Sequence, residues 1–71
     1  MIHPIKTPED LGSVIRKRRK DNGMTLKEAA ALAGVGVRFL SELERGKATS
    51  QLGLALKILQ LFGLDLQVQE R

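Results

Sequence analysis

The side chains best suited to contact another molecule lie between residues 37 and 45. Side chains of suitable chemistry recur there at intervals of three to four residues, which places them on one face of a helix. The members of this face are Val37, Arg38, Ser41, Glu42 and Arg45. Leu40 and Leu43 share the other face, where they are suited to a core. The pattern predicts a helix that is buried on one side and free to contact a partner on the other.

Catalytic and metal chemistry find little support in the composition. His3 is the only histidine, and we expect it to lie on the surface of a short leader. The chain has no cysteine, so disulfides and thiolate metal sites are excluded. Gly34 and Gly36 do not follow a strand, as a phosphate-cradling loop would require. We therefore expect no enzymatic activity and no cofactor.

The contact face must be positioned by the residues that precede it. Thr25 and Glu28 have the spacing of a capping box, and an alanine-rich run with high helix propensity follows them. Gly34 and Gly36 permit a tight turn, after which a second helix begins near Gly36 or Val37 and ends at Gly46. This is the pattern of a helix-turn-helix. The alternative is an ordinary helical hairpin within a small bundle.

An earlier helix must supply part of the core. Thr7 is a suitable N-cap, Pro8 fits the first helical position, and two acidic residues follow. This helix should extend to about Asn22, with Gly23 after it. Within it, the basic residues Arg16, Lys17 and Lys20 read as a solvated face. Arg19 lies four residues after Ile15 and should reach the edge of the core, where it needs a carboxylate; Glu44 is the candidate.

The last part of the chain changes its periodicity. Residues 51–62 predict a helix with an apolar stripe that Gly63 ends, and residues 64–70 then alternate apolar and polar side chains. Leu64, Leu66 and Val68 would face one way on a strand. Because a lone strand leaves its backbone groups unpaired, its expected partner is the same segment of a second chain. The alternative is a frayed tail.

Size and charge narrow the class of protein. A chain of 71 residues forms one small domain, which buries only about 60% of its unfolded surface and gains from a second copy or partner. The net charge of +4 favours a polyanionic or acidic partner. No apolar run approaches the ~20 residues of a membrane span. We expect a cytoplasmic protein with no membrane association.

From Leu11 to Leu64 the chain resembles the Xre/Cro-type helix-turn-helix family. The matching landmarks are Arg19, Thr25, Ala30, Gly34, Val35 and Ser41, together with the run Leu43-Glu44-Arg45-Gly46-Lys47. More narrowly, the approach to the first helix, residues 56–60 and the terminal alternation are similar to HipB-like antitoxins. Members of that group repress their own operon and bind a HipA-like kinase toxin.

The resemblance implies roles for individual side chains toward DNA. Val37, Arg38 and Glu42 would face base edges, with Ser41 on the same face; Arg38 can bond a guanine in bidentate fashion. The expected phosphate contacts are Lys27, Arg45, Lys47 and Thr49. Two positions depart from the family pattern, because Leu26 replaces a phosphate-binding glutamine and Gly36 replaces a capping Ser or Thr.

These observations predict an all-α, lambda-repressor-like domain of four to five helices. Residues 1–6 would form an extended leader, 7–63 the DNA-binding domain, and 64–71 a strand that pairs across a dimer. The predicted function is a sequence-specific repressor that binds a near-palindromic double-stranded operator as a homodimer and neutralises a HipA-like kinase toxin. The alternative is a module with the same fold that mainly sequesters a partner protein.

Overall fold

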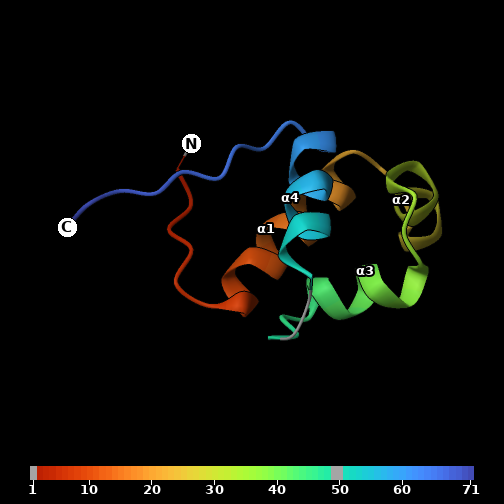
Figure 1. The fold of residues 1–71 in the computed structure, drawn as a ribbon. Coiled ribbons are helices and arrows are strands. Elements are labelled where there is room, and N and C mark those ends of the chain that lie inside the picture. The colour runs from red at the N-terminus through yellow and green to blue at the C-terminus, as the bar shows by residue number, and fades with distance from the viewer. Residues whose placement is uncertain (1, 49–50) are drawn as a thin grey trace.

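The computed structural model describes residues 2–48 and 51–71, which form four helices (Figure 1). The helices are α1 (Pro8–Asp21), α2 (Leu26–Ala33), α3 (Val37–Glu44) and α4 (Leu52–Leu61). The prediction of an all-α domain is therefore confirmed at its lower helix count for this part of the chain. None of the helices in the described ranges is long and apolar enough to cross a membrane.

Capping boxes start the first two helices. The Thr25 hydroxyl accepts from the Glu28 backbone N–H at 3.1 Å, and the Glu28 carboxylate accepts from the Thr25 N–H at 2.9 Å. Thr7 and Asp10 form the same reciprocal pair at the start of α1. The backbone hydrogen bond from Thr25 lowers the pKa of Glu28, and that from Lys6 lowers the pKa of Asp10. Both carboxylates therefore favour the charged form that caps a helix N-terminus.

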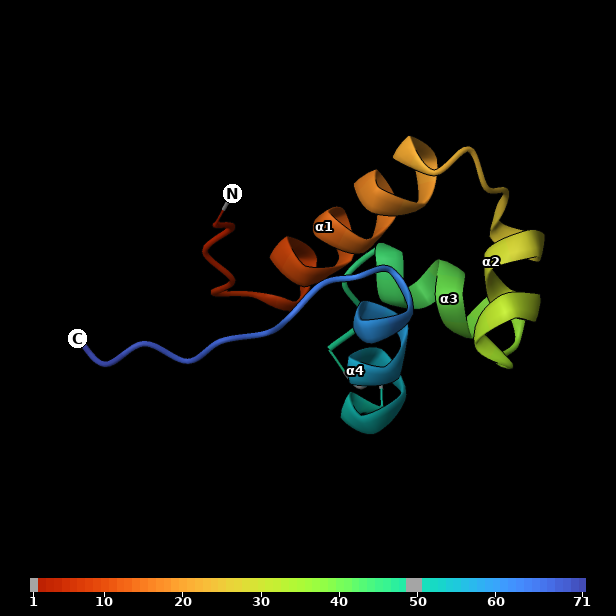
Figure 2. The same cartoon turned by 90° about the horizontal axis from the view of Figure 1, so that it is seen from above.

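Helix α3 lies at the centre of the packing. It contacts both α1 and α2 (Figure 2). Helix α2 also contacts α4. Ile15 of α1, Leu40 of α3 and Ile58 of α4 are the largest fully buried side chains. Three alanines of α2 complete the close packing around α3, namely Ala29, Ala30 and Ala33. Both helices of the predicted helix-turn-helix, α2 and α3, thus contribute side chains to one core.

Two glycines bring α3 close to α1. A Cβ on Gly12 would lie 2.5 Å from the carbonyl oxygens of Leu43 and Glu44, so only glycine permits this approach. Gly46 has a φ of +85°, and a Cβ there would lie 2.7 Å from the backbone of Glu9. The end of α3 is therefore pressed directly against the first half of α1.

The C-terminal segment differs from the expectation. No residue between 64 and 71 is in a strand, so the predicted strand is not observed in this chain. The Leu64 N–H donates to the Leu59 carbonyl at 2.8 Å, which makes Leu64 part of the cap that ends α4. Leu64 packs against the core, whereas Leu66 is exposed and the Val68 side chain is 97% exposed. Alternation indicated a strand, but residues 2–48 and 51–71 of the single chain include no neighbouring strand with which this segment could bond.

Candidate nucleic-acid interface

The turn before α3 sets the direction of the contact face. Gly34 ends α2 in the left-handed conformation, with φ +70°, and Gly36 is the N-cap of α3. Gly36 makes no side-chain cap hydrogen bond, so the first backbone N–H groups of α3 remain uncapped by a side chain. These donors stand at a helix N-terminus, which attracts anions such as phosphate.

The outer face of α3 holds the residues expected to read bases. Val37 is 44% exposed and the Arg38 side chain is 91% exposed. Ser41 and Glu42 lie further along the same face and are half-buried. Phe39 is only partly exposed and packs against the core, as expected for a residue at its edge. This face therefore presents an apolar side chain, a guanidinium, a hydroxyl and a carboxylate, a combination that suits contacts to base edges.

Glu42 is held by two cations. Its carboxylate accepts a hydrogen bond from Lys47 Nζ at 2.7 Å and lies 3.5 Å from Arg38 Nε. The hydrogen bond from Lys47 lowers the pKa of Glu42, with smaller contributions from the charges of Lys47, Arg38 and Arg45. The carboxylate is therefore ionised near neutral pH, and the expected phosphate ligand Lys47 is engaged within the protein.

Backbone geometry at the end of α3 brings Lys47 to Glu42. The Lys47 N–H donates to the Glu42 carbonyl at 3.0 Å, and the Gly46 N–H donates to the Leu43 carbonyl at 3.1 Å. These two bonds form a Schellman motif, which depends on the positive φ of Gly46. The sequence identified both residues but not their contact. Two side chains five residues apart come together here only because this turn follows the helix.

The inner face of α3 ends in a buried ion pair. Arg19 donates to Glu44 through Nε at 2.7 Å and through a terminal nitrogen at 3.0 Å. Another guanidinium nitrogen donates to the Met24 carbonyl at 2.8 Å. The hydrogen bonds to Glu44 raise the pKa of Arg19. The structure thus joins the two residues that the sequence singled out as a pair, and the pair links α1 to the end of α3.

Three of the four expected phosphate contacts lie within the described residues, and all three are exposed. Lys27 is exposed in the first turn of α2, and Arg45 and Lys47 are exposed at the end of α3. Thr49 lies outside the described residues. Leu26, the departure from the family pattern, packs partly against the core and offers no polar group there.

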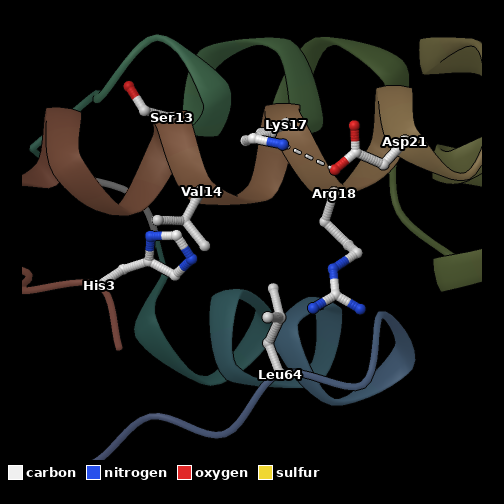
Figure 3. Close-up of a pocket in the computed structure, with 7 residues that line it drawn as sticks. All are labelled: His3, Ser13, Val14, Lys17, Arg18, Asp21 and Leu64. Atoms are coloured by element: carbon white, nitrogen blue, oxygen red, sulfur yellow. Dashed lines mark hydrogen bonds and ion pairs between the residues drawn. The ribbon is translucent and has the colours of Figure 1, made fainter. Parts of the chain in front are cut away.

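Arg18 has a structural role that the sequence did not specify. It donates to the carbonyl of Phe62 at 3.2 Å and so ties α1 to the cap of α4. Beside it, a groove of about 320 Å³ is lined on α1 by Val14, Lys17 and Asp21 (Figure 3). His3 and Leu64 close the opposite wall. Only the fold shows the hydrogen bond from Arg18 to Phe62, because these residues are far apart in the sequence.

Comparisons with known proteins agree with this arrangement. The helix-turn-helix family model matches residues 15–69. The chain is 43% identical over 68 residues to y4mF of Sinorhizobium fredii, described as an uncharacterized HTH-type transcriptional regulator; the match covers 96% of this chain and 90% of that protein. A chain of the HipB-O4 20mer complex superposes with a TM-score of 0.85 at 26% identity, covering 97% of both chains. A chain of the HipA-HipB-O2-O3 complex matches with the same TM-score, identity and coverage.

Proposed function

The chain belongs to the helix-turn-helix family, and from this premise we propose that it is a sequence-specific transcriptional repressor that reads DNA through the outer face of α3. The observation that carries the proposal is the exposed face that begins with Val37 and Arg38. Val37 would contact a thymine methyl group, and Arg38 would bond a guanine. Ser41 and Glu42 would make the remaining base contacts.

The phosphate backbone would be bound on either side of this face. Lys27 lies near the N-terminus of α2, and Arg45 and Lys47 lie beyond the C-terminus of α3. We include Thr49 in this set from the sequence. Cationic contacts of this kind fix the position of a protein on the duplex, while the residues of α3 select the sequence.

We further propose that the protein acts as a homodimer on a near-palindromic operator. A small domain with exposed apolar side chains gains from a second copy, and Leu66 and Val68 provide such side chains beyond α4. Residues 64–71 would then form the dimerisation segment, next to the DNA-binding domain of residues 7–63. A two-fold dimer would place its two α3 helices about 34–36 Å apart, one turn of DNA.

The likeness to a chain of the HipA-HipB-O2-O3 complex supports an antitoxin role. In this role the protein would repress its own operon and neutralise a HipA-like kinase toxin. A module that only sequesters a partner would keep the fold without needing an exposed arginine on α3.

A gel-shift titration tests the proposed function. The wild-type protein should bind the DNA upstream of its own gene at least ~1,000-fold more tightly than a scrambled duplex at the same salt concentration. Equal binding to both duplexes would contradict sequence-specific repression. Absence of DNA binding with retained binding to a co-expressed kinase-like neighbour would favour the sequestering module.

Removal of residues 65–71 tests the dimer. The truncated protein should sediment as a monomer at concentrations where the wild type is a dimer, because Leu66 and Val68 are lost from the interface. Operator affinity should fall by about 100-fold or more, since the second half-site no longer benefits from high effective concentration. A truncated protein that remains dimeric would place the interface elsewhere.

A further inference from the structure

We propose that Glu42 is a specificity-determining residue that withholds Lys47 from phosphate on non-cognate DNA. On a cognate half-site, a base amino group would bind the carboxylate and so release Lys47 to the DNA backbone. The inference rests on the proposed function and deepens it. It explains why an acidic residue lies at the centre of the α3 face that would bind DNA, which is a polyanion.

The first argument is the geometry of the free protein. The Glu42–Lys47 contact is short, at 2.7 Å, and the Lys47 side chain is 49% exposed. The Glu42 side chain is only 22% exposed, and both of its carboxylate oxygens are paired, Oε2 with Lys47 and Oε1 with Arg38. A base donor that binds Glu42 therefore competes with one of these cations.

The two cations are held to different degrees. The Arg38 contact is longer, at 3.5 Å, and its side chain is 91% exposed. Arg38 can therefore approach a guanine without first breaking a close hydrogen bond. Lys47 must break one, and its backbone is fixed beside Glu42 by the hydrogen bond to the Glu42 carbonyl. Lys47 is thus the cation that Glu42 can withhold.

Cognate and non-cognate half-sites would be distinguished by whether Glu42 finds a new partner when Lys47 leaves it. When Lys47 moves to a phosphate, the Glu42 carboxylate loses its hydrogen bond and faces a negatively charged groove. A cytosine N4 amino group is a suitable replacement donor, since acidic side chains accept from it in the major groove. A half-site without a donor at that position leaves the carboxylate unpaired, so the exchange is unfavourable.

The test compares four variants on operator and random DNA over a series of salt concentrations. Glu42→Gln removes the charge with little change of shape. The control is Asp21→Asn, which removes one negative charge from another exposed ion pair: Lys17 contacts Asp21 at 2.9 Å on α1 (Figure 3). Lys47→Ala and the double variant Glu42→Gln/Lys47→Ala complete a cycle that isolates the pair.

We expect Glu42→Gln to tighten binding to random DNA by about 3- to 10-fold and to steepen its salt dependence by about one unit of slope per half-site. Operator affinity should not rise, so the ratio of specific to random binding falls by at least the same factor. Asp21→Asn should change random binding by less than about 2-fold, because screening limits distant charges. The tighter binding to random DNA caused by Glu42→Gln should be absent when Lys47→Ala is also present.

Three results would overturn the inference while leaving the proposed function intact. They are a gain no larger than that of Asp21→Asn, an equal gain on operator and random DNA, and a gain that persists without Lys47. A wild-type protein that does not prefer its operator would instead overturn the proposed function, and the inference with it.

Discussion

Glu42 and Glu44 lie on opposite faces of α3, and each pairs with a cation outside the helix. Glu44 meets Arg19 in the core, where both side chains are less than a tenth exposed. Glu42 meets Lys47 on the surface, where the contact is equally short but one partner is half exposed. The distances are the same, at 2.7 Å, so distance does not separate the two pairs.

Burial separates them. A buried charge that loses its partner keeps the cost of desolvation, so the inner pair cannot be broken without a large loss of stability. An exposed ion pair contributes little to stability, because water replaces either partner. The inner pair can therefore fix the position of α3, while the outer pair can exchange partners on DNA.

The largest expected effect comes from breaking the inner pair. Glu44→Ala should lower the free energy of unfolding by about 3–5 kcal/mol, because Arg19 would remain charged in a buried site. Chemical denaturation measures this change. Glu42→Gln is the matched control on the outer face and should melt close to the wild type. If Glu44→Ala had the same free energy of unfolding as the wild type, the inner pair would not stabilise the fold.

A smaller loss of stability is expected at the close approach of α1 to α3. Gly12→Ala should destabilise the protein by about 1–3 kcal/mol, because its Cβ would overlap the carbonyl oxygens beside Glu44. Gly53→Ala is the control, since Gly53 lies within α4 and no described residue lies within 4 Å of an added Cβ, so the change should raise helix stability. An unchanged melting temperature for Gly12→Ala would mean that the two helices separate at little cost.

On the outer face, the effect should appear in binding and not in folding. Arg38→Ala should weaken operator binding by about 1–3 kcal/mol and relax the preference at one base position in each half-site. Its melting temperature should match that of the wild type, because the side chain is almost fully exposed. Competition titrations with single-base operator variants measure the change. Equal weakening on operator and random DNA would assign Arg38 to the phosphate backbone.

The smallest expected effect is at the start of α3. Gly36→Ser should stabilise the protein by a few tenths of a kcal/mol, because the hydroxyl would cap a backbone N–H that glycine leaves uncapped. The extended backbone of Gly36 suits serine, and no atom of the described part of the chain lies within 4 Å of the added Cβ. Thermal melts of the two proteins provide the comparison. A lower melting temperature would show that glycine is required at this turn.

Local chemistry was sufficient to predict the helices and most of their ends. Thr7 and Thr25 are N-caps, and Gly23, Gly34, Gly46 and Gly63 have the positive φ expected where a helix ends. Helical periodicity also placed Leu40 and Leu43 in the core and Arg38 outside it. These features depend on hydrogen bonds and side-chain spacing within a few residues, which a sequence contains directly.

Tertiary structure decided the contacts between distant residues and the fate of the last segment. The pressing of Gly12 against α3 and the bond from Arg18 to Phe62 both depend on how helices meet in space. Strict alternation after Gly63 predicted a strand, but the Leu64 N–H caps α4 instead. A strand requires a neighbouring strand to accept its hydrogen bonds, and no local pattern can supply one.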